Sequence, residues 1–301
     1  MKHIFYHALD FDGFCSGAVT KYKLLQDGCS ETDIQLHPYV YECPFPYDSI
    51  KEKDELFFVD VVVQPYSEMI EIYNKYDTTI IDHHKTFIDF ISTQILKGRQ
   101  ETGLKAACEL CWEYFFPDID TPNVVKLLSA YDAFNKSDIG RWENVIFPFQ
   151  YGMRAQNISP ISNWGFWKAL FNSEPEDEDR FIFQTIQNGL PVIEYQKQID
   201  VKILEAGMFE ATFDGLKAVC CNTNFQNTLF FESRWDEDKY DLMIAFNINK
   251  NQIFSISLYT TKKDINVGEL AKNHGGGGHP KAAGFTCKNF LVEEGVIYFN
   301  N

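Results

Sequence analysis

Acidic and imidazole side chains follow three separate apolar runs in the first third of the chain. Asp82, His83 and His84 come directly after the run 78–81, which is typical of the end of a buried strand. Placing three such polar side chains at a strand end is costly unless something binds them. The same arrangement occurs after two earlier runs, 4–6 and 56–59, where the candidate ligands are His7, Asp10, Asp12 and Asp60. Hard ligands gathered along one sheet edge could hold two metal ions that activate water for hydrolysis.

Asp10 and Asp12 lie two residues apart, so in an extended segment both carboxylates point to the same side. Two neighbouring carboxylates repel one another unless a cation lies between them. Gly13 suits a sharp turn from the strand into the helix that follows. The alternative is an Asx turn that caps this helix, which needs only one of the two acids.

Two further acids are weaker candidates on local evidence. Asp60 alone could be a helix N-cap, but it gains weight from the motif at 82–84. Asp132 lies at the end of the apolar helix expected over 121–131, where a carboxylate is unfavourable against the helix dipole. A metal would explain Asp132, and an exposed acid at a fraying helix end explains it equally well.

A run of four glycines, Gly275 to Gly278, precedes His279. Glycines let the backbone approach a ligand closely and turn several N–H groups into one anion-binding nest. His279 could donate a further hydrogen bond to a phosphate. A flexible linker is the alternative, but linkers rarely carry a histidine and the small residues 282–284 in a fixed frame. The pattern therefore favours phosphate binding.

Short apolar runs alternate with helical patterns through the first half of the chain. This alternation predicts an α/β fold in which an N-terminal parallel sheet is sandwiched by helices. Ligands bind beyond the carboxyl ends of the strands in such sheets, which is where the candidate ligands fall. The expected strands are 3–7, 34–41, 56–62 and 78–82, and the expected helices are 14–27, 65–76, 103–116 and 121–131.

The second half changes character after a long amphipathic helix, which Gly189 and Pro191 could bend or interrupt. Alternating patterns then predict a smaller mixed-sheet α/β domain. The expected helix is 178–204, the expected strands lie in 210–220, 241–248 and 252–260, and a short helix follows at 264–272. The predicted parts are a metal-binding catalytic domain at 1–177, a helical connector at 178–207 and a substrate-binding domain at 208–301.

The 301 residues are 45% hydrophobic and carry a formal net charge of −16. Such a negative chain is poorly suited to a long duplex, which requires many Lys and Arg contacts with phosphates. A short anionic substrate needs only a few basic contacts, and divalent cations would offset acidic charge locally. The sequence has no apolar run of membrane-spanning length and no signal-peptide pattern, so we expect a cytoplasmic protein with no membrane partner.

Taken together and in this order, the motifs resemble those of the DHH phosphoesterase superfamily with its DHH-associated C-terminal domain. The matching stretches extend from residue 7 to residue 285. Proteins of this kind are Mn²⁺-dependent phosphohydrolases. They include nanoRNases, phosphatases of 3′-phosphoadenosine-5′-phosphate (pAp), cyclic-di-AMP phosphodiesterases and single-strand DNA exonucleases.

The resemblance implies a cofactor of two Mn²⁺ ions, with Mg²⁺ as the alternative, and a division of labour among the candidate residues. Asp60, His83 and His84 would be catalytic, with His84 facing the substrate phosphate and Asp82 orienting a histidine. The implied metal ligands are His7 and Asp10 for one ion, Asp12, His83 and Asp132 for the other, and Asp60 for both. The implied substrate-binding residues are His84, Tyr259, Gly276, Gly277, Gly278 and His279.

The chain departs from many relatives at two places. Two residues rather than three separate His7 from Asp10. Tyr259 stands where many relatives carry an arginine, so the bidentate grip of arginine on phosphate is lost there. Tyr259 could instead stack on a base, with Lys262 or Lys281 supplying charge.

The predicted function is therefore hydrolysis of short oligonucleotides to mononucleotides by attack of a hydroxide held between two metals. The alternatives within the same chemistry are a cyclic-dinucleotide phosphodiesterase and a hydrolase of pAp-type small phosphates. A nucleotide-binding sensor without turnover is the non-enzymatic alternative, although such a protein would be expected to lose a ligand. The expected partner is a short oligonucleotide or small nucleotide, and a homodimer is left open.

Overall fold

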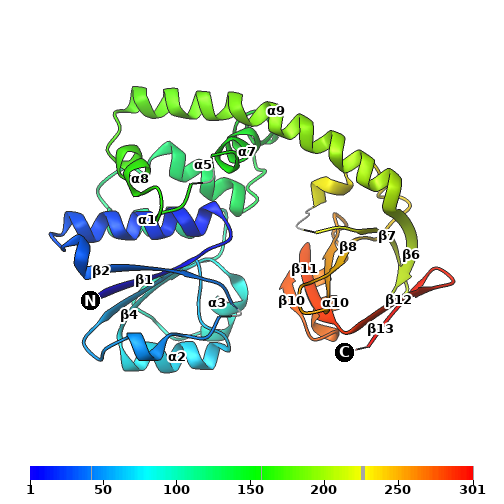
Figure 1. The fold of residues 1–301 in the computed structure, drawn as a ribbon, viewed down its shortest axis with the longest axis horizontal. Coiled ribbons are helices and arrows are strands. Elements are labelled where there is room, and N and C mark those ends of the chain that lie inside the picture. Colours follow the sequence, from blue (N-terminus) through cyan, green and yellow to red (C-terminus); the bar gives the residue numbers. More distant parts are fainter. Residues whose placement is uncertain (42, 157, 225–227, 301) are drawn as a thin grey trace. The chain divides into compact units, whose positions relative to one another are not determined.

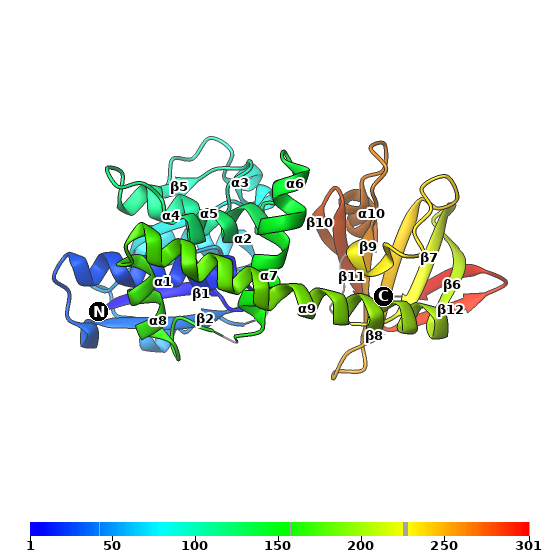
Figure 2. The ribbon, with the colours of Figure 1, turned by 90° about the horizontal axis from the view of Figure 1, so that it is seen from above.

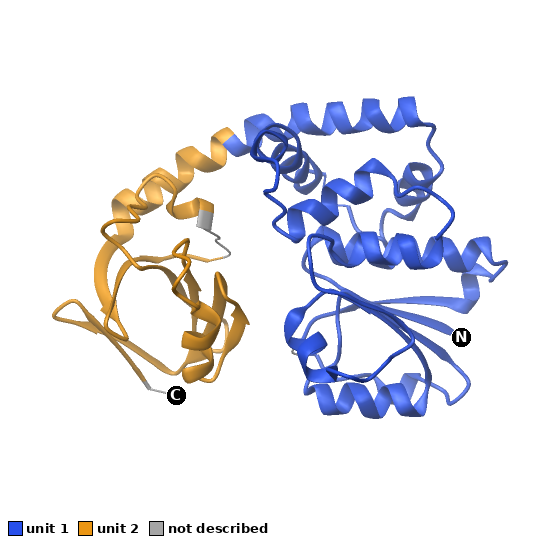
Figure 3. Ribbon diagram, turned by 180° about the vertical axis from the view of Figure 1, so that it is seen from behind, with its two compact units in different colours: residues 1–193 blue, residues 194–301 orange. Residues whose placement is uncertain are grey.

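The computed structural model describes residues 1–300 apart from 42, 157 and 225–227. It divides into two compact units, Met1–Ile193 and Glu194–Asn301 (Figure 3). The division falls within one long helix, α9 (Pro175–Gly207), which covers almost all of the predicted connector. None of the helices in the described part of the chain combines the length and the apolar composition that a membrane span needs.

The first unit is built on a parallel five-stranded sheet, as the alternation of apolar runs predicts. The strand order is β2-β1-β3-β4-β5, and every neighbouring pair is parallel. The strands are β1 (Lys2–His7), β2 (Ile34–Tyr39), β3 (Glu55–Val59), β4 (Asp77–Asp82) and β5 (Gly98–Gln100). The order reverses direction between β1 and β3, and the crevice outside the carboxyl ends at such a point is where these sheets bind ligands.

Helices cover both faces of this sheet, because successive residues of its strands point to opposite sides. Ile4 and Tyr6 of β1 pack into the apolar cluster formed with α1 (Phe11–Gln26), α4 (Ala107–Phe115) and α5 (Asn123–Asp132). Phe5 packs on the other face, against α2 (Tyr66–Lys75) and α3 (Lys85–Ile91). Figure 1 shows α1 and α2 on opposite sides of the sheet. The predicted sandwich is confirmed.

Some elements of the first unit escaped prediction. β5 consists only of the three residues 98–100, so it offers no alternating pattern to detect. α3 is seven residues long and buries only Phe87 and Ile91. The segment 133–174 forms α6 (Ile139–Arg141), a π-helical turn η3 (Trp142–Ile146), α7 (Phe147–Arg154) and α8 (Trp164–Phe171). Two short 3₁₀ turns are η1 (Glu31–Asp33) and η2 (Tyr47–Ser49).

Helix α9 stays continuous through Gly189 and Pro191, which the sequence suggested could break it. Gly189 has a different role, because α7 and α9 approach each other backbone to backbone at this residue. A Cβ atom on Gly152 would lie 1.9 Å from the Thr185 carbonyl oxygen, and one on Gly189 would lie 1.9 Å from the Pro148 carbonyl oxygen. The two helices therefore cross at a pair of glycines that leave no room for a side chain.

The second unit contains a mixed eight-stranded sheet of order β10-β11-β9-β8-β7-β6-β13-β12 (Figure 2). α10 (Val267–Asn273) packs on one face through Val267 and Ala271, and η4 (Thr228–Phe231) and Leu204 of α9 pack on the other. The strands are β6 (Met208–Phe213), β7 (Leu216–Asn222), β8 (Leu242–Ile248), β9 (Phe254–Tyr259), β10 (Gly277–His279), β11 (Ala282–Cys287), β12 (Asn289–Glu293) and β13 (Val296–Asn300). The predicted smaller mixed α/β domain is confirmed.

The glycine crossing predicts that Gly189→Ala destabilises the protein. The added methyl group meets backbone rather than a movable side chain, so we expect a loss of about 1–3 kcal/mol of unfolding free energy, measured by urea denaturation. Gly165→Ala in α8 is the matched control, because a Cβ there has no atom within 4 Å. That control should be neutral or stabilising by up to about 1 kcal/mol. Equal effects of the two substitutions would contradict the crossing.

Candidate metal centre

The structure brings the six predicted metal ligands together at the carboxyl edge of the first sheet. Strand ends supply His7, Asp60 and His83, since these residues end or directly follow β1, β3 and β4. Helix ends supply the others. The nitrogen and oxygen atoms of each of three groups lie within 4.8 Å of one another: His7, Asp10 and Asp60; Asp12, His83 and Asp132; and Asp60, His83 and His84.

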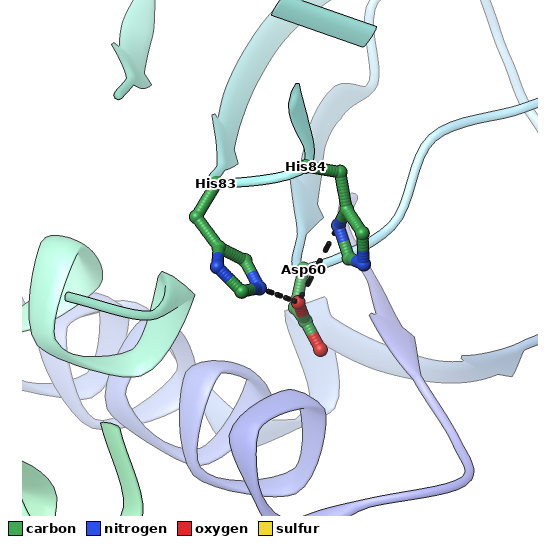
Figure 4. A group of neighbouring side chains, drawn as sticks. All are labelled: Asp60, His83 and His84. Carbon is green, nitrogen blue, oxygen red and sulfur yellow. Dashed lines mark ion pairs between the residues drawn. The ribbon is translucent and has the colours of Figure 1, made fainter. Parts of the chain in front are cut away.

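Asp60 faces His83 and His84 (Figure 4), and its other carboxylate oxygen lies toward His7. Its Oδ2 is 3.5 Å from Nδ1 of His7, whereas its Oδ1 is 3.4 Å from Nε2 of His83. The residue is 1% exposed, and its backbone has a φ of 61°, a left-handed conformation that is strained for a side chain other than glycine. Each carboxylate oxygen of Asp60 therefore faces a different group, as a carboxylate shared by two cations would.

The two acids of the first motif have structural partners as well. Asp10 is the N-cap of α1 and accepts a hydrogen bond from the Gly13 amide at 2.9 Å, as the Asx-turn alternative requires. Asp12 accepts from the amides of Ala107 and Cys108 at the start of α4, at 2.9 and 2.7 Å. These backbone bonds fix both carboxylates in place and leave lone pairs on each for a cation.

Gly13 explains how the first helix can begin so close to the end of β1. A Cβ atom at this position would lie 2.0 Å from the carbonyl oxygen of His7. The glycine therefore lets α1 approach the strand end that carries His7, and this approach brings Asp10 within 2.8 Å of the His7 ring.

Three buried atoms of the cluster are suited to bind a metal ion. His7 Nδ1, Asp60 Oδ1 and His83 Nε2 have no hydrogen-bond partner among these residues, although carboxylate oxygens lie close by. Buried polar atoms are normally paired, so these atoms, which belong to two neighbouring ligand groups, fit a pair of bound cations. The four carboxylates of the cluster would carry four negative charges, which two divalent cations cancel.

The pKa values of the side chains in the cluster reflect the negative charge of its four carboxylates. Burial lowers the pKa of His83, but the carboxylates of Asp132 and Asp60 outweigh burial and raise it to about 12. For His7, burial likewise lowers the pKa, and Asp10 and Asp60 raise it to about 11. Burial, with the neighbouring acids, raises the pKa of Asp12 well above its ordinary value. Protons on these groups balance the buried acids, and a divalent cation takes the place of such protons.

His84 differs from His83 because a buried carboxylate holds it. Asp82 is fully buried, and its Oδ1 lies 2.7 Å from Nδ1 of His84 and accepts from the His84 amide at 3.0 Å. Burial lowers the pKa of His84, but Asp82 raises it to about 9. Because Asp82 holds Nδ1, a bound molecule would have to interact with the other ring nitrogen of His84, Nε2.

Tyr41 also lies at this edge, and it was not among the residues predicted for the site. Its ring centroid lies 5.8 Å from that of His7 and 6.2 Å from that of His84. Burial raises the pKa of the Tyr41 hydroxyl, so it stays a hydrogen-bond donor. Tyr41 follows the carboxyl end of β2, and a search of every strand end for polar side chains would have found it.

Three of the predicted substrate-binding residues of the second unit, Gly277, Gly278 and His279, lie in a hairpin. Residues 277–279 are strand β10 and pair with β11. A Cβ on Gly276 would lie 2.1 Å from the Gly284 carbonyl oxygen, and one on Gly278 would lie 2.6 Å from Cα of Ala283, so close packing requires both glycines. Gly277 borders open space.

Tyr259 lies at the end of β9 and is 9% exposed, in the apolar cluster with Leu204 and Phe231. Its predicted stacking on a base, and the predicted contacts of His279 with phosphate, stay predictions.

Known proteins resemble the chain over most of its length. The DHHA1 domain family matches residues 233–297. "Uncharacterized protein R106" of Acanthamoeba polyphaga mimivirus is 23% identical over 93% of this chain, which spans only 66% of that protein. "Oligoribonuclease NrnB" of Bacillus subtilis is 22% identical over 97% of this chain and 74% of its own length. The fold resembles that of RecJ from Thermus thermophilus, solved with Mn²⁺, with a TM-score of 0.50, 12% identity and coverage of 94% of this chain and 49% of RecJ.

The geometry predicts that Asp60→Asn weakens metal binding. The substitution takes away the charge that both groups share, so we expect Mn²⁺ affinity to fall at least about 10-fold and one of the two ions to be lost. Titration calorimetry on chelator-stripped protein measures both quantities. Asp77→Asn, at the amino end of β4 and exposed beside Lys97, is the matched control. Binding of two ions with unchanged affinity by Asp60→Asn would rule out a shared ligand.

Proposed function

Since the chain belongs to the DHH phosphoesterase superfamily, we propose that it hydrolyses the phosphodiester bonds of short oligonucleotides and releases mononucleotides, using divalent cations held at the carboxyl edge of its first sheet. The observation that carries this proposal is the position of Asp60, with one carboxylate oxygen toward each of two ligand groups. Enzymes that place two cations around a shared carboxylate commonly catalyse phosphoryl transfer.

The ligands fall into two sets around Asp60. Mn²⁺ is the expected ion, because a mixture of imidazole and carboxylate suits it, and Mg²⁺ is the alternative. The chemistry that such a pair supplies is acidification of a water molecule and neutralisation of charge on the phosphate. One set is His7 and Asp10, and the other is Asp12, His83 and Asp132.

His84 provides the contact with the substrate phosphate in this proposal. Its Nδ1 is held by Asp82, which fixes the orientation of the ring, and Nε2 is the nitrogen that would donate to a phosphate oxygen. The raised pKa of His84, about 9, keeps the ring protonated at neutral pH, which favours an anionic partner. Asp82 acts through His84 by fixing the orientation of its ring.

In this proposal each of the three predicted parts of the chain has its own role. Residues 1–177 form the catalytic domain, 178–207 the connector and 208–301 the domain that binds the end of the substrate. In this proposal, Gly277 and His279 of the edge strand β10 contact that end of the substrate. The net charge of −16 supports a short substrate over a long duplex, and the name of the B. subtilis relative supports an oligoribonucleotide.

A hydrolase of cyclic dinucleotides or of pAp is the alternative, because the same metal groups would serve either substrate. A sensor without turnover agrees less well, because all six candidate ligands are present and gathered. The expected cytoplasmic location and the homodimer stay predictions.

A substrate panel separates these functions. We expect purified protein with Mn²⁺ to convert a 5′-phosphorylated dinucleotide into mononucleotides faster than it hydrolyses cyclic-di-AMP, pAp or pyrophosphate, and EDTA to abolish the reaction. Release of mononucleotide is followed by ion-exchange chromatography. If pAp or the cyclic dinucleotide is the preferred substrate, the alternative holds. If nothing is hydrolysed, the chain is a sensor.

His84→Gln should separate catalysis from metal binding. Glutamine keeps an amide near the same place but lacks the charge and the hold of Asp82, so we expect kcat to fall about 100-fold or more. The number of Mn²⁺ ions bound, measured by calorimetry, should stay at the wild-type value. A loss of metal together with activity would make His84 a ligand instead of a substrate contact.

A further inference from the structure

An aromatic and cationic cluster borders the metal centre at the end of α5, and the proposed mechanism does not use it. The cluster lies wholly within the first unit, and its residues belong to the end of α5, the segment after it, η3 and the end of α7. We call it the aromatic platform, and it consists of Tyr131, Phe134, Lys136, Trp142 and Arg154.

Phe134 has a backbone conformation that stability does not explain. α5 ends in a motif in which Asn135 donates to the Ala130 carbonyl at 2.9 Å and Phe134 donates to that of Tyr131 at 3.1 Å. Phe134 occupies the left-handed position of this motif with a φ of 51°, where glycine is the usual residue. Its side chain is 54% exposed, so burial does not repay the strain. A contact with a ligand molecule therefore explains a large exposed ring at this position better than stability does.

The ring of Phe134 has a rigid support. It stands edge to face against Trp142, with centroids 5.1 Å apart, and Trp142 is only 4% exposed. The Tyr131 ring stacks on Trp142 at 5.6 Å with an interplanar angle of 7°. Trp142 opens the π-helical turn η3, an irregularity that is frequent at functional sites.

Two cations flank these rings. Lys136 Nζ lies 4.2 Å from the centroid of Phe134 and 5.0 Å from that of Trp142. Arg154 Cζ lies 5.4 Å from the centroid of Tyr131. An exposed ring beside a cation suits a nucleotide, because the base can stack on the ring while the cation attracts the phosphate.

The platform lies within reach of the metal groups. Asp132, whose Oδ2 is 3.2 Å from Nε2 of His83, is adjacent to Tyr131 and two residues from Phe134. Two residues span about 7 Å at most, so the Cα atom of Phe134 lies no farther than this from the Cα atom of Asp132.

We propose that Phe134, supported by Trp142 and flanked by Lys136, is a base-stacking platform for the nucleotide that carries the cleaved phosphodiester. This inference rests on the proposed function for its substrate and makes the first unit select nucleotides by itself. The class of ligand is a nucleoside phosphate, recognised by the face of its base.

The test is calorimetric titration of the Mn²⁺-loaded full chain with AMP and with ribose 5-phosphate, which lacks the base. Stacking predicts that the wild type binds AMP about 10-fold more tightly than ribose 5-phosphate. Phe134→Leu should remove this preference and Phe134→Tyr should keep it. Phe134→Gly should also remove it while leaving the urea midpoint unchanged or higher, because glycine suits the backbone. Phe183→Leu, at a phenylalanine that is 62% exposed on α9, is the matched control and should change nothing.

Turnover of a dinucleotide by the same variants separates the two proposals. For Phe134→Leu we expect KM to rise about 10-fold with kcat within twofold of the wild type. An AMP preference that depends on Phe134 without any turnover would keep the platform and remove the proposed function. Normal turnover with an AMP preference that survives Phe134→Leu and Phe134→Gly, or no AMP preference in the wild type, would overturn the platform and leave the function intact.

Discussion

Four clustered carboxylates, two of them buried, cannot all keep their charge without a compensating cation. Asp60 and Asp12 are almost fully buried, and Asp10 and Asp132 lie next to them. The two histidines that face these acids have strongly raised pKa values, because the cluster attracts positive charge. A pair of divalent cations satisfies this demand and also supplies the chemistry of hydrolysis, so one electrostatic constraint links the fold to the proposed function.

The fold meets this constraint by bringing strand ends together and fixing them with backbone groups. The parallel sheet places His7, Asp60 and His83 at one edge from segments far apart in the sequence. Helix α4 directs two amides at Asp12, and Gly13 lets α1 start against β1. The ligand cluster is therefore held by rigid elements, while the platform around Phe134 offers the adjoining surface to a nucleotide.

The sequence predicted the parallel sheet, its helices and the residues at the strand ends, because periodicity and adjacent polar residues are local signals. The motif at 82–84 is contiguous, so it could be read directly. Tyr41 was missed although it follows a strand end, whereas Phe134 could not be found in this way, since its importance depends on a left-handed backbone and on contacts with Trp142. The glycine run was predicted to bind phosphate, and its pairing as strand β10 was not foreseen, since the close packing that requires Gly276 and Gly278 depends on β11.

The most direct test of the account is electron paramagnetic resonance of the chelator-stripped protein during titration with Mn²⁺. A carboxylate shared through Asp60 couples the spins of two ions, so we predict that the signal of isolated Mn²⁺ gives way to that of a coupled pair as the second ion binds. Two ions that bind without coupling, or a single ion at saturation, would contradict the shared site on which the account depends.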